Sequence, residues 1–261
     1  MKLIQMTDLH LHADPAARSR TGVPFSRLQA VVAAASAEQP DAVVVTGDIS
    51  QDETAASYAA AARLLDTLAC PWHWLPGNHD RLERMAAERA PPAAVDLGGW
   101  RMLLLDTQVP GAPYGRLGVR KLAAMATQLD KDRRPTLIAM HHPPVAVGAA
   151  WMDAIGLADC DAFWRTLAGY PQVRTVLFGH AHQTFAGQRQ NAGRTVDVYG
   201  CPAAADQFLP GATHFAVDPD ASPGYRVLAL DGGHLSTRVV RVCDAYSGAL
   251  QEKAARPVPG V

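Results

Sequence analysis

Short apolar runs alternate with helix-period segments along the chain as far as residue 179. Residues 2–7 and 41–47 have the pattern of buried strands, and residues 24–39 and 52–69 have that of helices, the second of which Asp52 could cap. Strands that alternate with helices form a largely parallel sheet whose faces are covered by helices. The pattern continues, with strands expected over 72–77, 100–107, 136–142 and 173–179 and helices over 81–90, 118–131 and 159–169.

The final part of the chain, from about residue 184, has a different pattern. Short runs of alternating apolar and polar residues are separated by Gly, Pro and Asp, as in residues 193–200 and 224–242. The Asp-Gly-Gly turn at 231–233 between two such runs is a strong hairpin signal. We expect this β-meander to form part of a second sheet. The prediction is an α/β fold of two mixed β-sheets packed face to face and flanked by helices, in a single domain over residues 1–261.

The composition is that of a globular protein that does not bind polyanions. Of the 261 residues, 48% are hydrophobic and 19% charged, and the net charge is −1 with both signs interspersed. No basic stripe suits polymeric nucleic acid or anionic lipid, and no run reaches the ~18 apolar residues of a membrane span. Asp8 breaks the first apolar run too early for a signal peptide. The four cysteines are scattered, so we expect reduced thiols and a cytoplasmic protein.

Residues that can bind metals follow five of the expected strands. They are Asp8 and His10, then Asp48, then Asn78 with His79 and Asp80, then His141 and His142, and finally His180 and His182. Any one of them alone is better explained as a turn residue, a helix cap or a half-buried imidazole. Five coincident strand ends are not, because the carboxyl ends of the strands in an α/β sheet form the crevice where ligands bind. We therefore interpret these residues as one cluster.

The types of side chain indicate two metals rather than one. Seven candidate ligands offer imidazole nitrogens and oxygens but no thiolate: Asp8, His10, Asp48, Asn78, His141, His180 and His182. This mixture favours Mn, Fe, Co or Zn over Mg or Ca, and seven ligands are too many for one small cation. Two divalent ions, two carboxylates, a hydroxide and a phosphodiester monoanion sum to zero charge, which weakly favours a diester over a monoester. A metal pair activates water and holds the oxygens of an in-line displacement.

Taken in order, five motifs resemble those of the calcineurin-like metallophosphoesterase superfamily. They are D-x-H (8–10), GD (47–48), GNHD (77–80), HHPP (141–144) and GHAH (179–182). The resemblance implies a single metallophosphoesterase domain with a four-layer α/β/β/α sandwich. It also implies how the ligands are shared between the metals. One metal would be held by Asp8, His10, Asp48 and His182, with Asp48 as the bridge, and the other site would be completed by Asn78, His141 and His180.

The same resemblance implies roles for the residues beside the ligands. His79 would lie near the phosphate, where it stabilises charge or protonates the leaving oxygen. Asp80 would either orient the His79 imidazole or cap the following helix. His142, the second histidine of the HHPP motif, is expected to support the ligands or to pack rather than to bind metal.

Within the superfamily, the chain is similar to the class III cyclic-nucleotide phosphodiesterases and their glycerophosphodiesterase relatives. The stretches that carry this similarity are 141–157, 201–211 and 224–242. The implied reaction is hydrolysis of a small phosphodiester, in the first place a 3′,5′-cyclic nucleotide such as cAMP, to the 5′-monophosphate by attack of hydroxide that the metals activate. The segment AAAD (203–206) replaces a Ser/Thr-rich segment of cyclic-nucleotide members and leaves the substrate open.

Two other functions are alternatives to a cyclic-nucleotide phosphodiesterase. The nearer one is a glycerophosphodiesterase, or a hydrolase of another small cyclic or open phosphodiester. The more distant one is a metal-binding module without catalysis, which is disfavoured because Asn78 and His79 are both present.

Two further positions are candidate substrate contacts beside Asn78 and His79. The insert 148–157 follows the strand that ends at His141 and is expected to lie over the crevice, where Trp151 could stack on a base. Packing within the loop or a homodimer contact is the alternative role of this insert. Arg18, in the loop after the first ligands, could contact phosphate or sugar, with a solvated charge as the alternative. The expected partners are a small phosphodiester and a second copy of the chain.

Overall fold

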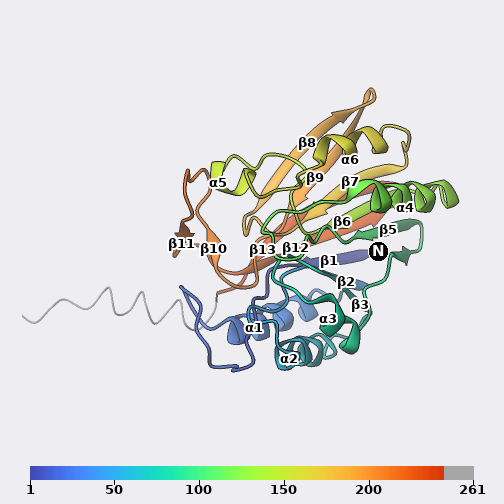
Figure 1. Ribbon diagram of the computed structural model, residues 1–261. Coiled ribbons are helices and arrows are strands. Elements are labelled where there is room, and N and C mark those ends of the chain that lie inside the picture. Colours follow the sequence, from blue (N-terminus) through green and yellow to red (C-terminus); the bar gives the residue numbers. More distant parts are fainter. Residues whose placement is uncertain (244–261) are drawn as a thin grey trace, which may run out of the picture.

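Two mixed β-sheets pack against each other in the computed structural model, which describes residues 1–243 (Figure 1). The five-stranded sheet has the order β13 (His234–Arg241), β12 (Gly224–Asp231), β1 (Lys2–Met6), β2 (Ala42–Thr46), β3 (Trp72–Leu75). The six-stranded sheet has the order β4 (Ala94–Leu97), β5 (Trp100–Leu105), β6 (Thr136–Met140), β7 (Val173–Phe178), β9 (Arg194–Gly200), β8 (Phe185–Asn191). A small separate pair is formed by β10 (Gln207–Phe208) and β11 (Val217–Asp218). Residues 244–261, which the single-domain prediction included, lie outside the described residues.

Helices cover the outer faces of both sheets and complete four layers (Figure 1). The five-stranded sheet is covered by α1 (Pro24–Ala37), α2 (Ala55–Leu65) and α3 (Leu82–Glu88). The six-stranded sheet is covered by α4 (Gly118–Lys131) and α6 (Cys160–Leu167). The short helix α5 (Ala150–Asp153) lies beside β10, where Trp151 contacts Phe208. This arrangement confirms the predicted fold of two mixed sheets flanked by helices.

Three hydrophobic cores separate the four layers, because successive residues of a strand point to opposite faces of its sheet. In β1, Leu3 points into the core between the two sheets, whereas Ile4 points into the core beneath α1 and α2. In β5, Leu104 and Leu103 divide in the same way between the inner core and the core beneath α4. All four side chains are buried, which explains why the strands have continuous apolar runs rather than an alternating pattern.

The strands after residue 184 are divided between the two sheets. β9 pairs with β7 in the six-stranded sheet, whereas β12 pairs antiparallel with β1 in the five-stranded sheet. The prediction that this region joins the second sheet is therefore wrong for β12 and β13, because alternation indicates a half-buried face but not the neighbouring strand. The predicted hairpin is confirmed. Asp231 pairs with His234 across Gly232 and Gly233, whose φ angles of 49° and 88° suit a two-residue turn.

The start of α2 also differs from the prediction. Thr54, not Asp52, is the N-cap residue, and its side chain accepts the N–H of Ser57 at 3.2 Å. Asp52 instead accepts the N–H of Ala13 at 2.7 Å and that of Thr54 at 3.2 Å. Asp52 therefore fastens the loop after β1 to the start of α2, close to the first candidate ligands.

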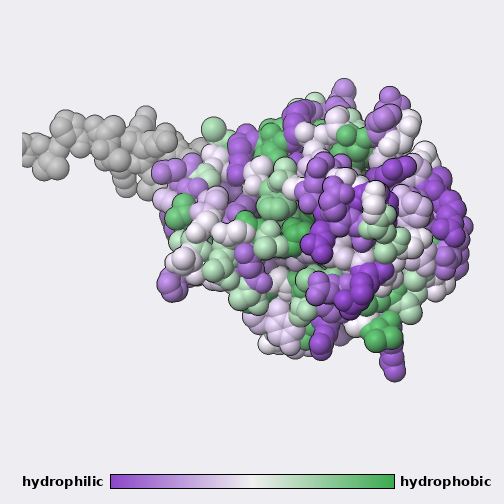
Figure 2. Space-filling view, turned by 90° about the horizontal axis from the view of Figure 1, so that it is seen from above, coloured by the Kyte–Doolittle hydropathy of each residue, from purple (hydrophilic) through white to green (hydrophobic). Residues whose placement is uncertain are grey.

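The surface is mixed in character on the face seen in Figure 2. Hydrophilic residues cover much of this face, and apolar residues form small separate groups between them. The longest helices, α1 and α4, have 14 residues each. Within residues 1–243, no helix combines the length and the apolar character needed to cross a bilayer.

Candidate metal centre

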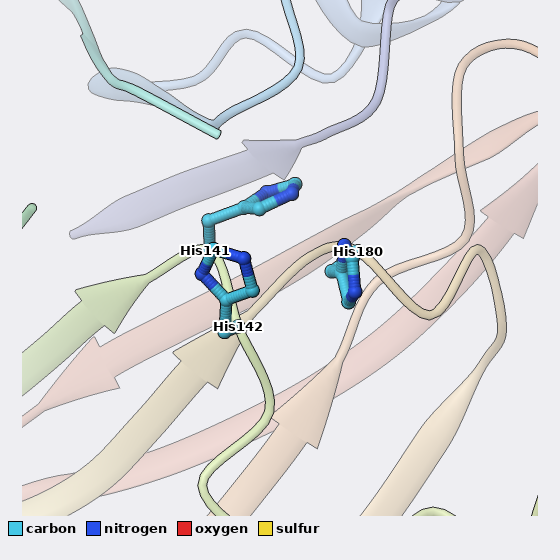
Figure 3. Close-up of side chains that lie close together, drawn as sticks. All are labelled: His141, His142 and His180. Carbon is cyan, nitrogen blue, oxygen red and sulfur yellow. The ribbon is translucent and has the colours of Figure 1, made fainter. Parts of the chain in front are cut away.

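The candidate ligands lie in loops at the carboxyl ends of five strands. In the five-stranded sheet these strands are β1, β2 and β3, which run parallel, and in the six-stranded sheet they are β6 and β7, which also run parallel. Parallel neighbours end on the same side, so the loops meet at one edge of the sandwich. Figure 3 shows His141 and His142 at the end of β6 close to His180, which follows β7.

Asp48 lies in the middle of the cluster. Its Oδ2 atom is 3.7 Å from Nε2 of His10 and 3.4 Å from Nε2 of His141. On the His10 side, Oδ1 of Asp8 lies 3.1 Å from Nε2 of His182. The Asp48 carboxylate thus lies close to the candidate ligands His10 and His141, as a ligand that bridges two metals must lie close to the other ligands of both.

The structure brings the predicted ligands together in overlapping groups. The ligand atoms of each group lie within 4.8 Å of one another, and the groups are Asp8–His10–His182, Asp8–Asp48–His141, His10–Asp48–His79 and His141–His142–His180. Asn78 joins through its Oδ1 atom, 3.1 Å from Nε2 of His141. His142, which the sequence analysis set aside, is also within reach, since its ring centroid lies 4.8 Å from that of His180.

The backbone at the ligands is strained. Five of them have positive φ angles, which L-residues other than glycine rarely adopt: Asp8 (54°), His10 (47°), Asp48 (52°), His180 (63°) and His182 (49°). Each such conformation costs about 1–2 kcal/mol, so the surrounding structure must hold it in place. Strain concentrated at five donor residues indicates that these loops are shaped to present side chains rather than for stability.

Glycines precede several ligands because there is no room for a side chain. A Cβ atom on Gly77 would overlap the carboxylate of Asp48, and one on Gly179 would overlap the hydroxyl of Thr7. A Cβ atom on Gly47, whose φ is +96°, would lie 2.5 Å from Nδ1 of His141. The close packing of the ligand loops therefore depends on these glycines.

Hydrogen bonds to Nδ1 fix the orientation of three candidate ligands. Nδ1 of His141 lies 2.8 Å from the carbonyl oxygen of Thr46, and Nδ1 of His182 lies 2.6 Å from that of Asp206. Because a carbonyl only accepts, each Nδ1 carries a proton, and Nε2 is the ring nitrogen that would bind a metal. Nδ1 of His10 is held in the same way by Oε1 of Gln51 at 2.8 Å.

The donor set fits the predicted metals. Nε2 of His180 is buried and has no hydrogen-bond partner within residues 1–243, as expected of a nitrogen that binds a metal ion. Neutral imidazoles and ionised carboxylates together suit Mn, Fe, Co or Zn. The groups of His and Asp side chains could thus hold metal ions.

In the protein without metals, burial and the neighbouring charges shift the pKa values of the cluster residues in opposite directions. Burial raises the pKa of Asp8, but the adjacent His182 outweighs it, and the pKa of Asp8 falls to about 2. Burial lowers the pKa of His141, but the Asp48 carboxylate outweighs it, and the pKa of His141 rises to about 9. Burial dominates at His10, whose pKa falls to about 4. Asp8 is thus ionised at neutral pH, as a metal ligand must be.

The contacts of Asp80 match neither of the two roles predicted for it, which were orienting His79 and capping α3. Its Oδ1 atom accepts the N–H of Ile49 at 3.0 Å, and its Oδ2 atom accepts the N–H of Gly77 at 2.8 Å. The N-cap position of α3 is Arg81, without a side-chain cap, so Asp80 does not cap that helix. Its oxygens are directed at backbone amides rather than at the His79 ring. Asp80 therefore holds the loops after β2 and β3 against each other, and its catalytic role stays a prediction.

Two cavities open beside the cluster and share His10, His79, His182, Phe208 and Phe215. The outer cavity, of about 580 Å³, is also lined by residues 18–20 and Gln51, so the predicted contact Arg18 lies on its wall.

The inner cavity, of about 170 Å³, is lined by the predicted contact Trp151 together with Met152 and Ile155. Phe208 and Phe215 were missed by sequence reasoning. Phe208 stacks on the ligand His182, with ring centroids 3.9 Å apart and an interplanar angle of 7°.

A two-sheet sandwich with imidazole and carboxylate donors at its strand ends is the arrangement of a metal-dependent phosphoesterase. The family model described as Calcineurin-like phosphoesterase matches residues 1–184, and the chain belongs to this family.

Several curated relatives resemble almost the whole chain. The 3′,5′-cyclic adenosine monophosphate phosphodiesterase CpdA of Pseudomonas aeruginosa is 40% identical over 252 residues, which cover 93% of this chain and 90% of that protein. The phosphodiesterase of the same name from Escherichia coli K12 is 34% identical over 258 residues, with 94% and 90% covered. A 3′,5′-cyclic-nucleotide phosphodiesterase of Nostoc is 34% identical over 254 residues, with 93% and 92% covered.

Solved structures share the fold at low sequence identity. A dimetal phosphatase from Danio rerio superposes with a TM-score of 0.67 at 13% identity, covering 94% of this chain and 99% of that one. A purple acid phosphatase from yellow lupin has a TM-score of 0.64 at 13% identity, covering 93% and 52%. These similarities confirm the fold alone.

Proposed function

We propose that the protein is a phosphodiesterase with two divalent metals that hydrolyses 3′,5′-cyclic nucleotides, with cAMP as the substrate. The observation that carries this proposal is the position of the Asp48 carboxylate between His10 and His141, which suits a bridging ligand. Relatives named as cyclic-nucleotide phosphodiesterases over nearly the whole chain support the substrate.

The proposed ligand sets follow the two sides of Asp48. One metal is proposed to bind Asp8, His10 and His182 together with Asp48, and the other Asn78, His141 and His180 together with Asp48. The short distances within Asp8–His10–His182 and between Asn78 and His141 support this division. When bound, the two metals supply Lewis-acid activation of the phosphate and of the attacking water. Their proposed identities are Mn, Fe, Zn or Co, because these ions accept mixed imidazole and oxygen ligands.

His79 is the proposed catalytic side chain that is not a metal ligand. Its backbone N–H donates to Oδ1 of Asp48 at 2.9 Å, which fixes the residue beside the proposed bridge. Its ring packs edge-on against His10 at a centroid distance of 5.1 Å and lines both cavities. From there the imidazole can give a proton to the ribose oxygen that leaves phosphorus. Asn78 is proposed to contact both metal and substrate.

The direct test is an assay of purified, Mn-loaded protein with cAMP beside bis(p-nitrophenyl) phosphate. The proposal expects turnover of both, with 5′-AMP as the product from cAMP. Turnover of the synthetic diester without cAMP hydrolysis would remove the nucleotide substrate, and glycerophosphodiesters in the same panel would then identify the alternative. Bound metal with no turnover of any diester would contradict an enzyme.

We also propose that the enzyme works in the cytoplasm. All four cysteines, at positions 70, 160, 201 and 243, are free thiols, which suits a reducing compartment. The homodimer and the contacts of Arg18 and Trp151 with the substrate remain predictions.

A further inference from the structure

The two cavities beside the metal centre differ in volume, which bears on the size of the molecule that each can hold. Ligand pockets for drug-sized molecules have volumes of roughly 300–1,000 Å³. The outer cavity, at about 580 Å³, lies within this range, whereas the inner cavity, at about 170 Å³, lies below it. The outer cavity therefore has the size of a nucleoside site, while the smaller inner cavity is lined by the candidate ligands Asp48, Asn78 and His180.

The outer cavity also has the chemical character of a nucleoside site. Phe215 lies on its rim with 47% of its surface exposed, and the guanidinium carbon of Arg20 lies 4.9 Å from the centre of the Phe215 ring. Phe208 contacts Phe215 at a centroid distance of 5.2 Å. Flat aromatic and guanidinium groups stack on bases, and the polar side chains of Ser19 and Gln51 line the same cavity and can bond to a sugar.

The wall that carries Arg20 is held rigidly. The carboxylate of Asp206 accepts hydrogen bonds from the hydroxyl groups of Ser19 at 2.6 Å and Thr21 at 2.5 Å, and from the N–H of Arg20 at 2.9 Å. Arg27, itself buried, lies 3.1 Å from the same carboxylate. A wall fixed before the ligand arrives lowers the entropy cost of binding.

We propose that the outer cavity is the nucleoside subsite, in which Phe215 and Arg20 hold the base while the phosphate lies at the metal centre. This inference rests on the proposed function, because it names where the nucleoside half of that substrate is bound. The carbonyl oxygen of Asp206 also accepts from Nδ1 of the candidate ligand His182, so one residue sets the distance between subsite and metals.

The test compares two inhibitors of bis(p-nitrophenyl) phosphate hydrolysis by the full-length, Mn-loaded protein. Inorganic phosphate reports binding at the metal centre, and 5′-AMP reports that binding plus the nucleoside. The ratio of their inhibition constants isolates the nucleoside, and any change in the KM of the synthetic diester cancels. The subsite predicts that the wild-type protein binds 5′-AMP at least about tenfold more tightly than phosphate.

Variants then locate the nucleoside. Phe215→Ala and Arg20→Ala are expected to lower the preference for 5′-AMP roughly tenfold without changing inhibition by phosphate, and Phe215→Tyr to restore it. Tyr114→Ala, which removes an exposed aromatic side chain from a different surface hollow, is the matched control and should leave the ratio unchanged.

Two outcomes would overturn the assignment. The first is a wild-type protein that binds 5′-AMP and phosphate equally well. The second is a preference for 5′-AMP that survives Arg20→Ala, which changes only the outer cavity, but is lost in Ile155→Ala, which would put the base in the inner cavity. Neither depends on cAMP hydrolysis, so failure of the subsite is distinguishable from failure of the proposed function.

Discussion

His182 is held by Asp206 at one ring nitrogen and directed toward Asp8 by the other. Nδ1 lies 2.6 Å from the Asp206 carbonyl oxygen, and Nε2 lies 3.1 Å from Oδ1 of Asp8. The backbone of Asp206 thus orients a candidate metal ligand, while its carboxylate holds Ser19 and Thr21 in the wall of the outer cavity. The metal centre and the proposed subsite are built on one residue.

Replacing Asp206 is predicted to affect the subsite and stability more than the metals. Asp206→Ala keeps the backbone carbonyl that binds His182 but removes the carboxylate beside the buried Arg27, whose side chain is 5% exposed. We expect the free energy of unfolding to fall by about 3 kcal/mol and the KM for cAMP to rise roughly tenfold, with metal content unchanged. Urea denaturation, steady-state kinetics and metal analysis measure the three. Asp220→Ala, at an exposed position, is the control, and equal KM values in both variants would refute the link.

The glycine before Asn78 is predicted to be essential for the metal centre. In Gly77→Ala the new methyl group would overlap the Asp48 carboxylate and press on its backbone nitrogen, at 2.5 Å. Because Asp48 is the proposed bridge, we expect the kcat for bis(p-nitrophenyl) phosphate to fall about 100-fold and metal affinity to weaken. Gly99→Ala is the matched control, since nothing lies within 4 Å of its Cβ position. Full activity in both variants would contradict the prediction, because it would show that the loop around Gly77 moves to make room for the methyl group.

The sequence was sufficient to predict the layers and the gathering of the strand-end residues in one place. Each strand that enters the site is a short apolar run, and each run ends at a Gly, Asp, Asn or His that the packing of the ligand loops requires. The topology of parallel strands then brings Asp8, Asp48 and His180 to one edge although they are far apart in the chain. Periodicity predicted where each strand ends, and the rule that ligands bind at the carboxyl ends of the strands in an α/β sheet predicted that these residues meet.

Metal binding is predicted to become tighter as the pH rises toward 9. The pKa of His141 in the protein alone is raised to about 9, so near neutral pH this imidazole carries a proton that a metal must displace. For each proton that the metal displaces, the affinity for the metal is about tenfold weaker for every pH unit below that pKa. The raised pKa also affects stability, because protonated His141 contacts Asp48 only in the folded protein. This contact stabilises the folded protein fully below pH ~6.5, and the stabilisation is lost as the pH rises past about 9.

Calorimetric titration with Mn²⁺ from about pH 7 to about pH 8.5, in two buffers of different ionisation enthalpy, measures both the affinity and the protons released. The expected release is about one proton or more per chain at the lower pH. His214→Asn is the control, because that histidine is exposed and lies outside the candidate ligand groups. An affinity that does not change with pH would mean that His141 is already neutral.

The leaving group separates the role of His79 from that of the metals. If its imidazole protonates the leaving oxygen, His79→Asn should lower the kcat for cAMP roughly 100-fold, because a ribose alkoxide leaves poorly. The same variant should lower the kcat for bis(p-nitrophenyl) phosphate less than about tenfold, because nitrophenolate leaves without a proton. His234→Asn, at the exposed turn of the β12–β13 hairpin, serves as the control. Equal losses on both substrates would assign His79 to positioning alone.

What the sequence could not predict are the contacts between residues distant in the chain. Asp80 follows Asn78 and His79 and therefore looks like part of the active site, but its carboxylate binds the N–H groups of Ile49 and Gly77. Phe208 belongs to the two-residue strand β10 and Phe215 lies just before β11, and only the folded chain brings them beside His182 and Trp151. Such contacts depend on tertiary packing, which no local pattern encodes.

If a metal pair bridged by Asp48 hydrolyses cAMP, the rate must depend on two metals per chain. Mn²⁺ is added stepwise to protein stripped of metal, and the rate of cAMP hydrolysis is measured at each step. We expect a rate that rises until two equivalents per chain are bound and that is abolished in Asp48→Ala. Saturation at one equivalent, no cAMP turnover at any metal content, or full activity in Asp48→Ala would contradict it.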